Sequence, residues 1–270
     1  MNIFTTVLIQ PLANGLALFY SLLGGNMGLA IVAFSIFLRF VLNPLTKPYM
    51  ESMKKMKDLA PQLTKLKKKY GSDKVKFAQA QADFYKEKGV NPGAGCLPYI
   101  LQIVVLIAFF NVFVRVLSPN GDAVSQFNQL LYEPLKFGAG ETLNTKFLYL
   151  DVTKPDKFDI SFLPFSFPGP VLILSALIQF LSAKINMPYV KLEEKVAKKT
   201  SDKSDDFQVS MQKSMVYTFP LFTLFIGMQF ASGLAIYWLV FSATQAYQQV
   251  RSQGWGELTS FVTKIKLIKS

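Results

Sequence analysis

The feature that most limits how this chain can fold is a series of five apolar stretches, most of them about as long as a bilayer-crossing helix. Such a helix needs roughly 20 mainly apolar residues. Hydrophobic residues make up 51% of the 270-residue chain, which nevertheless carries a formal net charge of +12. This combination is typical of a membrane protein with basic loops. We therefore predict an all-α polytopic membrane protein with five transmembrane helices, at 27–46, 96–117, 167–186, 215–231 and 232–250.

The segments around these helices complete the predicted organisation. Residues 1–26 are apolar but interrupted by Pro11 and Gly15, which predicts a short helix lying at the membrane interface. The last two transmembrane helices are short and almost directly joined, which favours strong tilt or local thinning of the bilayer. The other predicted segments are a cytoplasmic helical hairpin at 47–95, an extracytoplasmic loop at 118–166, a cytoplasmic loop at 187–214 and a basic cytoplasmic tail at 251–270.

The distribution of lysine and arginine indicates the orientation. Segment 47–92 has 12 Lys, segment 187–213 has 6 Lys, and the tail has 4 Lys or Arg, whereas loop 118–166 has 4 Lys against 6 acidic residues. Because cytoplasmic loops are enriched in Lys and Arg, we expect the N-terminus outside and the C-terminus in the cytoplasm. Residues 1–38 carry no charge, so no secretory signal or Arg-rich transit peptide is expected, which favours a bacterial plasma (inner) membrane.

The predicted cytoplasmic hairpin has its own helical periodicity. Gly71, Ser72 and Asp73 break the pattern and offer a helix N-cap, and Gly89 ends the second arm. Pro61 is expected to kink the first arm. Apolar residues at three- and four-residue steps give each arm one apolar face: Met53, Met56, Leu63 and Leu66 in the first arm, and Val75, Ala78, Ala82 and Tyr85 in the second.

Arg39 lies inside the first predicted transmembrane helix, within the apolar run SIFLRFVLNPLTKP at 35–48. It precedes Lys47 by eight residues, or roughly 12 Å of helix, so its side chain would have to stretch to reach the interface. A charge at bilayer depth costs roughly 2.5–3.5 kcal/mol on insertion scales unless water or partners reach it. Charges inside membranes are therefore functional candidates by default.

Polar residues recur at helical spacing on the same predicted helix and on others, which predicts a hydrophilic groove that keeps Arg39 charged. The alternative is that Ser, Thr and Gln only join helices by hydrogen bonds, and for Gln179 we favour this alternative. The candidate groove residues are Arg39, Ser35, Asn43, Gln102, Gln179, Trp238 and Ser242.

The composition argues against enzymatic chemistry. The chain has no histidine and a single cysteine, Cys96, which removes the usual general base, the Ser-His-Asp triad and the commonest metal ligand. No Asp or Glu lies within a predicted transmembrane helix, so proton relays and paired-carboxylate proteases lack their acids. We predict no catalytic residue, no metal site and no cofactor.

Three motifs, in order and spacing, resemble the YidC membrane protein insertases, relatives of the mitochondrial and chloroplast oxidase-assembly insertases. The motifs are GLAIVAFSIFLRFVLNPLT, EKGVNPGAGCLPYILQ and AIYW, and the resemblance covers about residues 20–252. It implies a five-span core that inserts and helps to fold membrane proteins. The family's hydrophilic groove holds an arginine on the first span, matched here by Arg39, and Gln179 and Trp238 match further groove positions.

The resemblance also implies partners. Nascent membrane proteins are the expected substrates, received by the hairpin at about 48–89 and delivered by ribosomes that contact basic tails such as 251–270. The Sec translocon and the lipid bilayer are further expected partners, and DNA is not. Two alternatives stay open from the residues alone: a small-solute transporter or channel in which Arg39 binds an anion, and a structural scaffold whose hairpin recruits partners.

Overall fold

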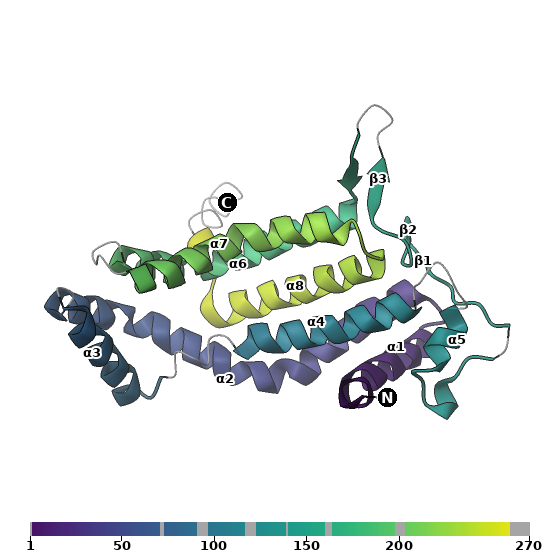
Figure 1. Cartoon of the computed structure of the whole chain (residues 1–270), viewed down its shortest axis with the longest axis horizontal. Coiled ribbons are helices and arrows are strands. Elements are labelled where there is room, and N and C mark those ends of the chain that lie inside the picture. Colours follow the sequence, from purple (N-terminus) through teal and green to yellow (C-terminus); the bar gives the residue numbers. More distant parts are fainter. Residues whose placement is uncertain are drawn as a thin grey trace, which may run out of the picture. The chain divides into compact units, whose positions relative to one another are not determined.

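The computed structural model describes residues 2–70, 73–90, 97–116, 123–138, 140–159, 164–197 and 203–259. Several predicted features lie outside the described residues: Cys96, the Gly71–Ser72 break, the tail beyond residue 259, and the side chains of Met53, Met56 and Gln102. The described part is mostly helical, as the all-α prediction requires, with short strands confined to the 118–166 loop and its end (Figure 1).

The chain divides into two compact units, which are described separately here. The first unit contains residues 1–41, 100–178 and 220–244, and the second contains residues 42–99, 179–219 and 245–270. The principal described elements are η1 (Thr5–Ile9), α1 (Gln10–Leu22), α2 (Met27–Tyr70), α3 (Lys74–Glu87), α4 (Leu97–Val116), α5 (Ala123–Asn128), η3 (Glu133–Leu135), β1 (Lys146–Phe147), β2 (Leu150–Asp151), β3 (Lys157–Asp159), β4 (Ser166–Pro168), α6 (Pro170–Ala197), α7 (Lys203–Gly227), α8 (Ser232–Gln253) and η4 (Gly256–Leu258).

The N-terminal segment differs from its prediction, because the chain stays helical through both Pro11 and Gly15. A π-helical turn, η1, leads directly into α1, and Pro11 occupies the first turn of α1, where its missing N–H is not needed. Gly15 lies under the ring of Phe34, and a side-chain carbon there would come within 2.4 Å of that ring. The helix packs closely on α2 for this reason. Its location at the membrane interface stays a prediction.

Length and hydropathy alone qualify two helical stretches within the described residues as membrane spans, Thr5–Leu22 and Met27–Leu45. Shorter apolar helical stretches occur at Ile103–Val116, Pro170–Ile185 and Val216–Gly227, within the second, third and fourth predicted transmembrane helices. The first of the two spans was predicted as an interfacial helix. The count of five transmembrane helices stays a prediction.

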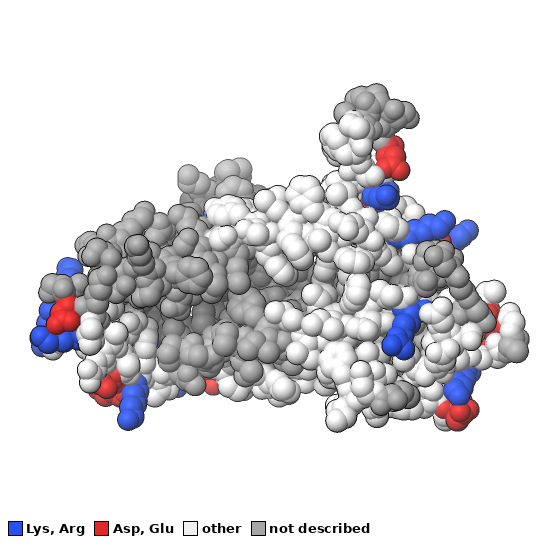
Figure 2. All heavy atoms as spheres, viewed as in Figure 1, with Lys and Arg blue, Asp and Glu red and all other residues white. Residues whose placement is uncertain are grey.

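The 118–166 loop contains structure that the all-α prediction did not include. It folds into α5, η3 and two small antiparallel sheets, β1 with β2 and β3 with β4. Lys and Arg side chains gather at the base of the β3–β4 hairpin and over the neighbouring loops, whereas the helix surface beside them is uncharged (Figure 2).

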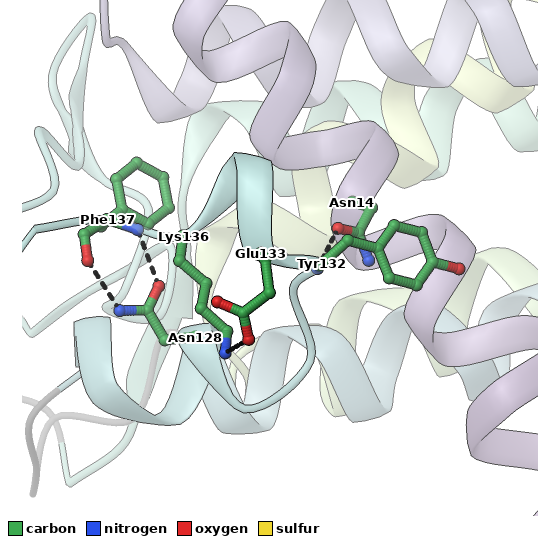
Figure 3. A network of polar contacts seen from close by, with 6 residues as sticks. All are labelled: Asn14, Asn128, Tyr132, Glu133, Lys136 and Phe137. Atoms are coloured by element: carbon green, nitrogen blue, oxygen red, sulfur yellow. Dashed lines mark hydrogen bonds and ion pairs between the residues drawn. The ribbon is translucent and has the colours of Figure 1, made fainter.

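Asn14 of α1 anchors the first part of this loop (Figure 3). Its buried amide group donates to the Gln10 carbonyl at 2.8 Å and to the Leu130 carbonyl at 3.0 Å, and its carbonyl accepts from the Tyr132 N–H at 2.7 Å. Asn128 closes the next turn by exchanging two hydrogen bonds with the backbone of Phe137, each 2.9 Å long. Buried polar groups need such partners, so this loop is built into the first unit.

The second part of the loop caps α6. Helix N-termini leave backbone N–H groups unsatisfied, and Gly169, the residue before α6, has no side chain to cap them. The Tyr149 hydroxyl accepts from the Val171 N–H at 3.0 Å, and the Asp156 carboxylate accepts from the Leu172 N–H at 2.8 Å. The Tyr149 hydroxyl in turn donates a hydrogen bond to the Asp156 carboxylate at 2.9 Å. Partial burial, together with this bond, raises the pKa of Tyr149 to about 12, although the Val171 N–H opposes the rise.

The same loop also holds the start of α8. The Ser232 N–H donates to the Lys154 carbonyl at 2.7 Å, and the Gly233 N–H donates to the Val152 carbonyl at 3.0 Å. The Ser232 hydroxyl adds a 3.0 Å bond to the Asp151 carbonyl. Residues 149–156 therefore satisfy the first N–H groups of two helices at once.

In the second unit, α3 folds back beside the end of α2 and is capped at both ends. Asp73 accepts from the Lys76 N–H at 3.1 Å, which lowers the pKa of Asp73 and confirms the predicted N-cap. At the other end Gly89 has φ +62°, and the N–H groups of Gly89 and Val90 donate to the carbonyls of Lys86 and Tyr85. This is a Schellman motif, which confirms the predicted stop.

The apolar core of the hairpin is centred on Leu63, Tyr85 and Val90, with Leu59, Leu66 and Phe84 packed against it. The prediction for Leu63 and Leu66 is confirmed. For α3 the predicted face was wrong in part: Tyr85 is buried as predicted, but Val75, Ala78 and Ala82 are exposed, and Phe77 is buried instead. Phe77 and Phe84 are one heptad apart, and their larger apolar area favours burial of Phe77 and partial burial of Phe84 over burial of the alanines.

The first arm of the hairpin is not a separate helix. α2 runs without interruption from the first predicted transmembrane helix to Tyr70, and Pro44, Pro48 and Pro61 all lie inside it.

Candidate functional site

Arg39 is buried on α2, with only 8% of the residue exposed. Its guanidinium carbon lies 4.8 Å from the centroid of the Phe241 ring of α8. A guanidinium over an aromatic face is attracted by the ring quadrupole, and the attraction grows when water is excluded. The charge therefore lies inside the first unit, against an aromatic ring.

An aromatic cluster connects this ring to the neighbouring helices. The cluster consists of Phe34 of α2, Phe109 of α4, and Tyr237 and Phe241 of α8. Phe109 and Tyr237 stack with centroids 4.5 Å apart, and Tyr237 and Phe241 are 6.0 Å apart. Stacked rings of this kind are rigid contacts. Arg39 thus lies at one end of a packed aromatic cluster that joins α2, α4 and α8.

Ser35 lies one turn before Arg39 on the same face of α2 and is also buried, as predicted. Its hydroxyl donates to the Ile31 carbonyl at 2.5 Å. This bond to the preceding turn is the usual way in which a serine satisfies its hydroxyl within an apolar helix.

Trp238 and Ser242 of α8 are buried in the first unit, at 6% and 5% exposure. Both lie within one turn of Phe241, the ring beneath Arg39. The structure therefore brings the α8 candidates to the same stretch of helix that receives the guanidinium. Phe241 itself was not predicted. The available signal was its position three residues after Trp238, on a face already identified as polar.

The polar stripe of α6 includes two serines that hydrogen-bond to α8. In the first unit the Ser175 hydroxyl donates to the Ala235 carbonyl at 3.1 Å, and in the second the Ser182 hydroxyl donates to the Gln249 side chain at 2.7 Å. These two serines join helices, which is the alternative role considered for the stripe. Gln249, which is also buried, was missed, although it lies seven residues after Ser242 and continues the spacing of the α8 candidates.

Of the remaining candidates, Asn43 and Gln179 belong to the second unit, and the side chain of Gln102 lies outside the described residues. Gln179 is buried, whereas Asn43 is exposed. The Gln248 amide approaches the Asn43 carbonyl oxygen at 3.5 Å, the outer limit of a hydrogen bond. One groove shared by all the candidates stays a prediction. Among the described residues, no group of three or more His, Cys, Asp or Glu could hold a metal ion.

Comparison with known proteins identifies the family. The family model described as 60Kd inner membrane protein matches residues 18–255. The chain belongs to this family. Within it, the chain is 30% identical over 225 residues to the membrane protein insertase YidC of Fusobacterium nucleatum, covering 83% of this chain and 85% of the relative. The resemblance to YidC insertases found in the sequence is therefore confirmed.

Two further relatives show how the family varies in length. The chain is 28% identical to YidC 2 of Listeria innocua, over 89% of this chain and 69% of the relative. It is 30% identical to YidC of Roseobacter denitrificans over 86% of this chain, but spans only 35% of that relative. The family's shared region is thus the helical part that carries Arg39, Gln179 and Trp238.

Proposed function

We propose that this protein is a membrane protein insertase and chaperone. In this proposal it moves the polar flanks of nascent membrane proteins through a water-filled groove bearing Arg39, and it releases their hydrophobic segments into lipid. The observation that carries the proposal is the similarity, over most of both chains, to a relative named as a membrane protein insertase. The burial of Arg39 supports the mechanism.

Arg39 supplies attraction for the acidic flank of a substrate. A carboxylate that enters a low-dielectric environment loses hydration at a cost of several kcal/mol. A guanidinium at this depth offsets part of that cost through Coulomb attraction, which is far stronger than in bulk water. The Phe241 ring, with its centroid 4.8 Å from the guanidinium carbon, holds the cation in place.

The hydrophobic part of the substrate follows a different path. Burial of apolar side chains in lipid contributes about 25 cal/mol per Å², so a transmembrane segment leaves the groove for the bilayer once its flank has crossed. Ser35, Asn43, Gln102, Gln179, Trp238 and Ser242 would supply polar or amphipathic contacts during passage. No bond is made or broken, and the proposal needs no cofactor.

The cytoplasmic hairpin is proposed to receive the substrate first. Its Leu63–Tyr85–Val90 core keeps the two arms together, and both α2 and α3 carry exposed lysines. In the same proposal the ribosome contacts the basic tail and loops of this protein, and the Sec translocon is an optional partner. The protein would lie in the bacterial inner membrane, in agreement with the family description. In this proposal its N-terminus lies outside and its C-terminus lies in the cytoplasm.

The proposal is tested by insertion of ribosome-bound nascent chains into proteoliposomes that contain the purified full chain. Two substrates are compared, identical except that the translocated flank is acidic in one and uncharged in the other. Arg39→Ala should reduce insertion of the acidic substrate much more than that of the neutral one, and Arg39→Lys should be milder. Equal insertion of the acidic substrate by wild type and Arg39→Ala would overturn the mechanism.

A labelling experiment separates the insertase from a solute transporter. Single cysteines at Ser35, Asn43 and Gln179, in a Cys96→Ser background, are tested with a membrane-impermeant thiol reagent from each side. An insertase groove open to the cytoplasm predicts labelling from the cytoplasmic side only. Labelling from outside would favour a transporter with an anion site at Arg39.

A further inference from the structure

The β3–β4 hairpin projects from the first unit beside the ends of α6 and α7, and it does not continue the line of the helices (Figure 1). Its strands pair in register through Lys157 with Pro168, Phe158 with Phe167, and Asp159 with Ser166. β3 is exposed along its whole length, so none of the residues that the structure describes covers its outer side. Such a hairpin is unstable alone in water, so we expect a surface outside this chain to cover its exposed side chains.

The exposed side chains of the hairpin are mainly aromatic. Phe158 is 47% exposed and Phe165 is 57% exposed. Phe167 lies between them, with ring centroids 6.0 Å from Phe158 and 5.2 Å from Phe165. Aromatic side chains are typical of the level where lipid headgroups meet the acyl chains.

A cavity of about 440 Å³ lies between the hairpin and the end of α7. This volume falls within the roughly 300–1,000 Å³ of sites that hold small molecules. Its lining is mainly apolar, with one cationic side chain and one amide: Phe165, Phe225, Met228, Ser166, Lys157 and Gln229.

The cavity is continuous with an apolar helix surface. On α7, Leu221, Phe222 and Phe225 are 52–64% exposed, and Phe225 also lines the cavity. On the first turns of α6, Leu174 and Leu177 are 46% and 54% exposed. In a membrane protein such side chains face acyl chains. An acyl chain that lies along α7 would therefore reach the cavity at the C-terminal end of α7, where Lys157 offers a positive charge.

We propose that this cavity binds one phospholipid of the outer leaflet. Its phosphate would lie against Lys157 and the Gln229 amide, and an acyl chain would lie against Phe165, Phe225 and Met228. The hairpin would then lie flat at the headgroup level and hold a lipid beside α6 and α7. The inference rests on the membrane orientation in the proposed function, because it places the ends of these helices at the outer surface.

The first experiment measures the depth of the hairpin in the membrane. A nitroxide is attached to a cysteine at Phe165 in the full chain with Cys96→Ser, reconstituted in vesicles of phosphatidylethanolamine and phosphatidylglycerol. We expect the label at 165 to collide more with oxygen than with a water-soluble nickel complex. A label at Thr142, which is exposed in the same loop, should show the reverse. A water-accessible label at 165 would overturn the proposal.

The second experiment tests the phosphate contact. The full chain is released from phosphatidylglycerol-containing detergent, and the retained lipid is counted by native mass spectrometry. Lys157→Ala should weaken retention roughly two- to fivefold, the range for a solvent-accessible ion pair. Lys154→Ala is the matched control, because this lysine lies in the same loop but does not line the cavity. Equal lipid retention by wild type and Lys157→Ala would contradict the lipid site. A mass spectrum that shows a bound peptide in place of lipid would also contradict it.

The two proposals fail separately. Arg39→Ala should leave the nitroxide accessibility at 165 and the lipid count unchanged. Lys157→Ala should leave insertion of the neutral-flank substrate unchanged. If insertion fails but the lipid is retained, the lipid site stands without the insertase mechanism.

Discussion

The carboxylate of Asp156 accepts a hydrogen bond from the backbone N–H of Leu172 at 2.8 Å, so a loop residue caps the start of α6 from 16 positions away in the chain. Asp156 is only 2% exposed, and the Tyr149 hydroxyl donates to its other oxygen at 2.9 Å. The Gly169 N–H also donates to the Asp156 carbonyl at 2.8 Å. The position of α6 therefore depends on a residue that no helical pattern contains.

Asp156→Ala should destabilise the protein by about 1–3 kcal/mol, because a buried helix N–H and the Tyr149 hydroxyl both lose their acceptor. Asp156→Asn should cost less, because its carbonyl oxygen still accepts one of the two bonds. The measurement is the midpoint of thermal unfolding of the full chain in detergent. Asp159→Asn is the control, because this carboxylate is exposed on β3 of the same loop. Equal midpoints for Asp156→Ala and wild type would show that the cap contributes nothing.

Gly169→Ala should also destabilise the protein, by about 1–3 kcal/mol, because an ideal side-chain carbon at 169 would overlap the Asp156 carboxylate. Removing that carboxylate should relieve the overlap. The loss caused by Gly169→Ala should therefore be smaller in an Asp156→Ala background than in wild type, which a double-mutant cycle of unfolding midpoints measures. If the stability losses of Gly169→Ala and Asp156→Ala were strictly additive, the clash of the alanine side chain would not be with the Asp156 carboxylate.

Phe241→Leu should slow insertion of a substrate with an acidic flank by roughly two- to fivefold, because a cation–π contact contributes about 0.5–1 kcal/mol at its weaker end. Leucine keeps much of the apolar volume but has no ring face for the Arg39 guanidinium. Insertion of the matched neutral-flank substrate should be unaffected. Phe110→Leu is the control, because its ring contacts Phe230 rather than the aromatic cluster that carries Arg39. A similar loss with both substrates would indicate a packing defect in place of a charge effect.

Tyr149 should titrate near pH 12, two units above an ordinary tyrosine. Its folded-state pKa is raised, so its neutral form stabilises the fold fully below about pH 10, and this stabilisation is lost as the pH rises through about 12. The measurement is the difference in phenolate absorbance between wild type and Tyr149→Phe across the alkaline range. Asp156→Asn should move that titration toward the ordinary value. A titration of Tyr149 at about pH 10 in wild type would contradict the hydrogen-bonded pair.

Gly89→Ala should weaken the end of α3 by about 1–2 kcal/mol, because φ is +62° there and an alanine resists the left-handed region. Faster amide hydrogen exchange in the last turn of α3 would report the loss. Lys88→Ala, at an ordinary φ of −82°, is the control and should change exchange little. Unchanged exchange in Gly89→Ala would mean that the Val90 N–H bond to Tyr85 does not depend on glycine.

Predictions from local pattern were accurate where neighbouring residues decide the structure. The Asp73 cap and the stop at Gly89 were predicted because both depend on residues within one turn. The wrong face of α3 shows the limit of the same reasoning. Val75 and Ala78 fit a helical period as well as Phe77 does, yet Phe77 is buried and the other two are exposed, so local pattern alone does not decide which face is buried.

The candidate site divides in the same way. The sequence identified Arg39 as a buried charge, because a cation within an apolar run stands out from its neighbours and is costly at bilayer depth. Its partner ring, Phe241, lies about 200 positions later, and one apolar aromatic among 25 phenylalanines carries no local mark. Gln249 was missed although it lies at helical spacing from Ser242, and its hydrogen bond with Ser182 is visible only in the structure.

The amino-acid sequence by itself determined the helical membrane class, the family and the position of Arg39 within an apolar run, because hydrophobic length and charge asymmetry act locally along a chain. Only the tertiary structure decided that Phe241 receives Arg39 and that Asp156 and Tyr149 cap α6. It also decided that the 118–166 loop is folded into the first unit. Hydrogen bonds and ring contacts join residues that are far apart in sequence, and their geometry exists only after the helices have packed.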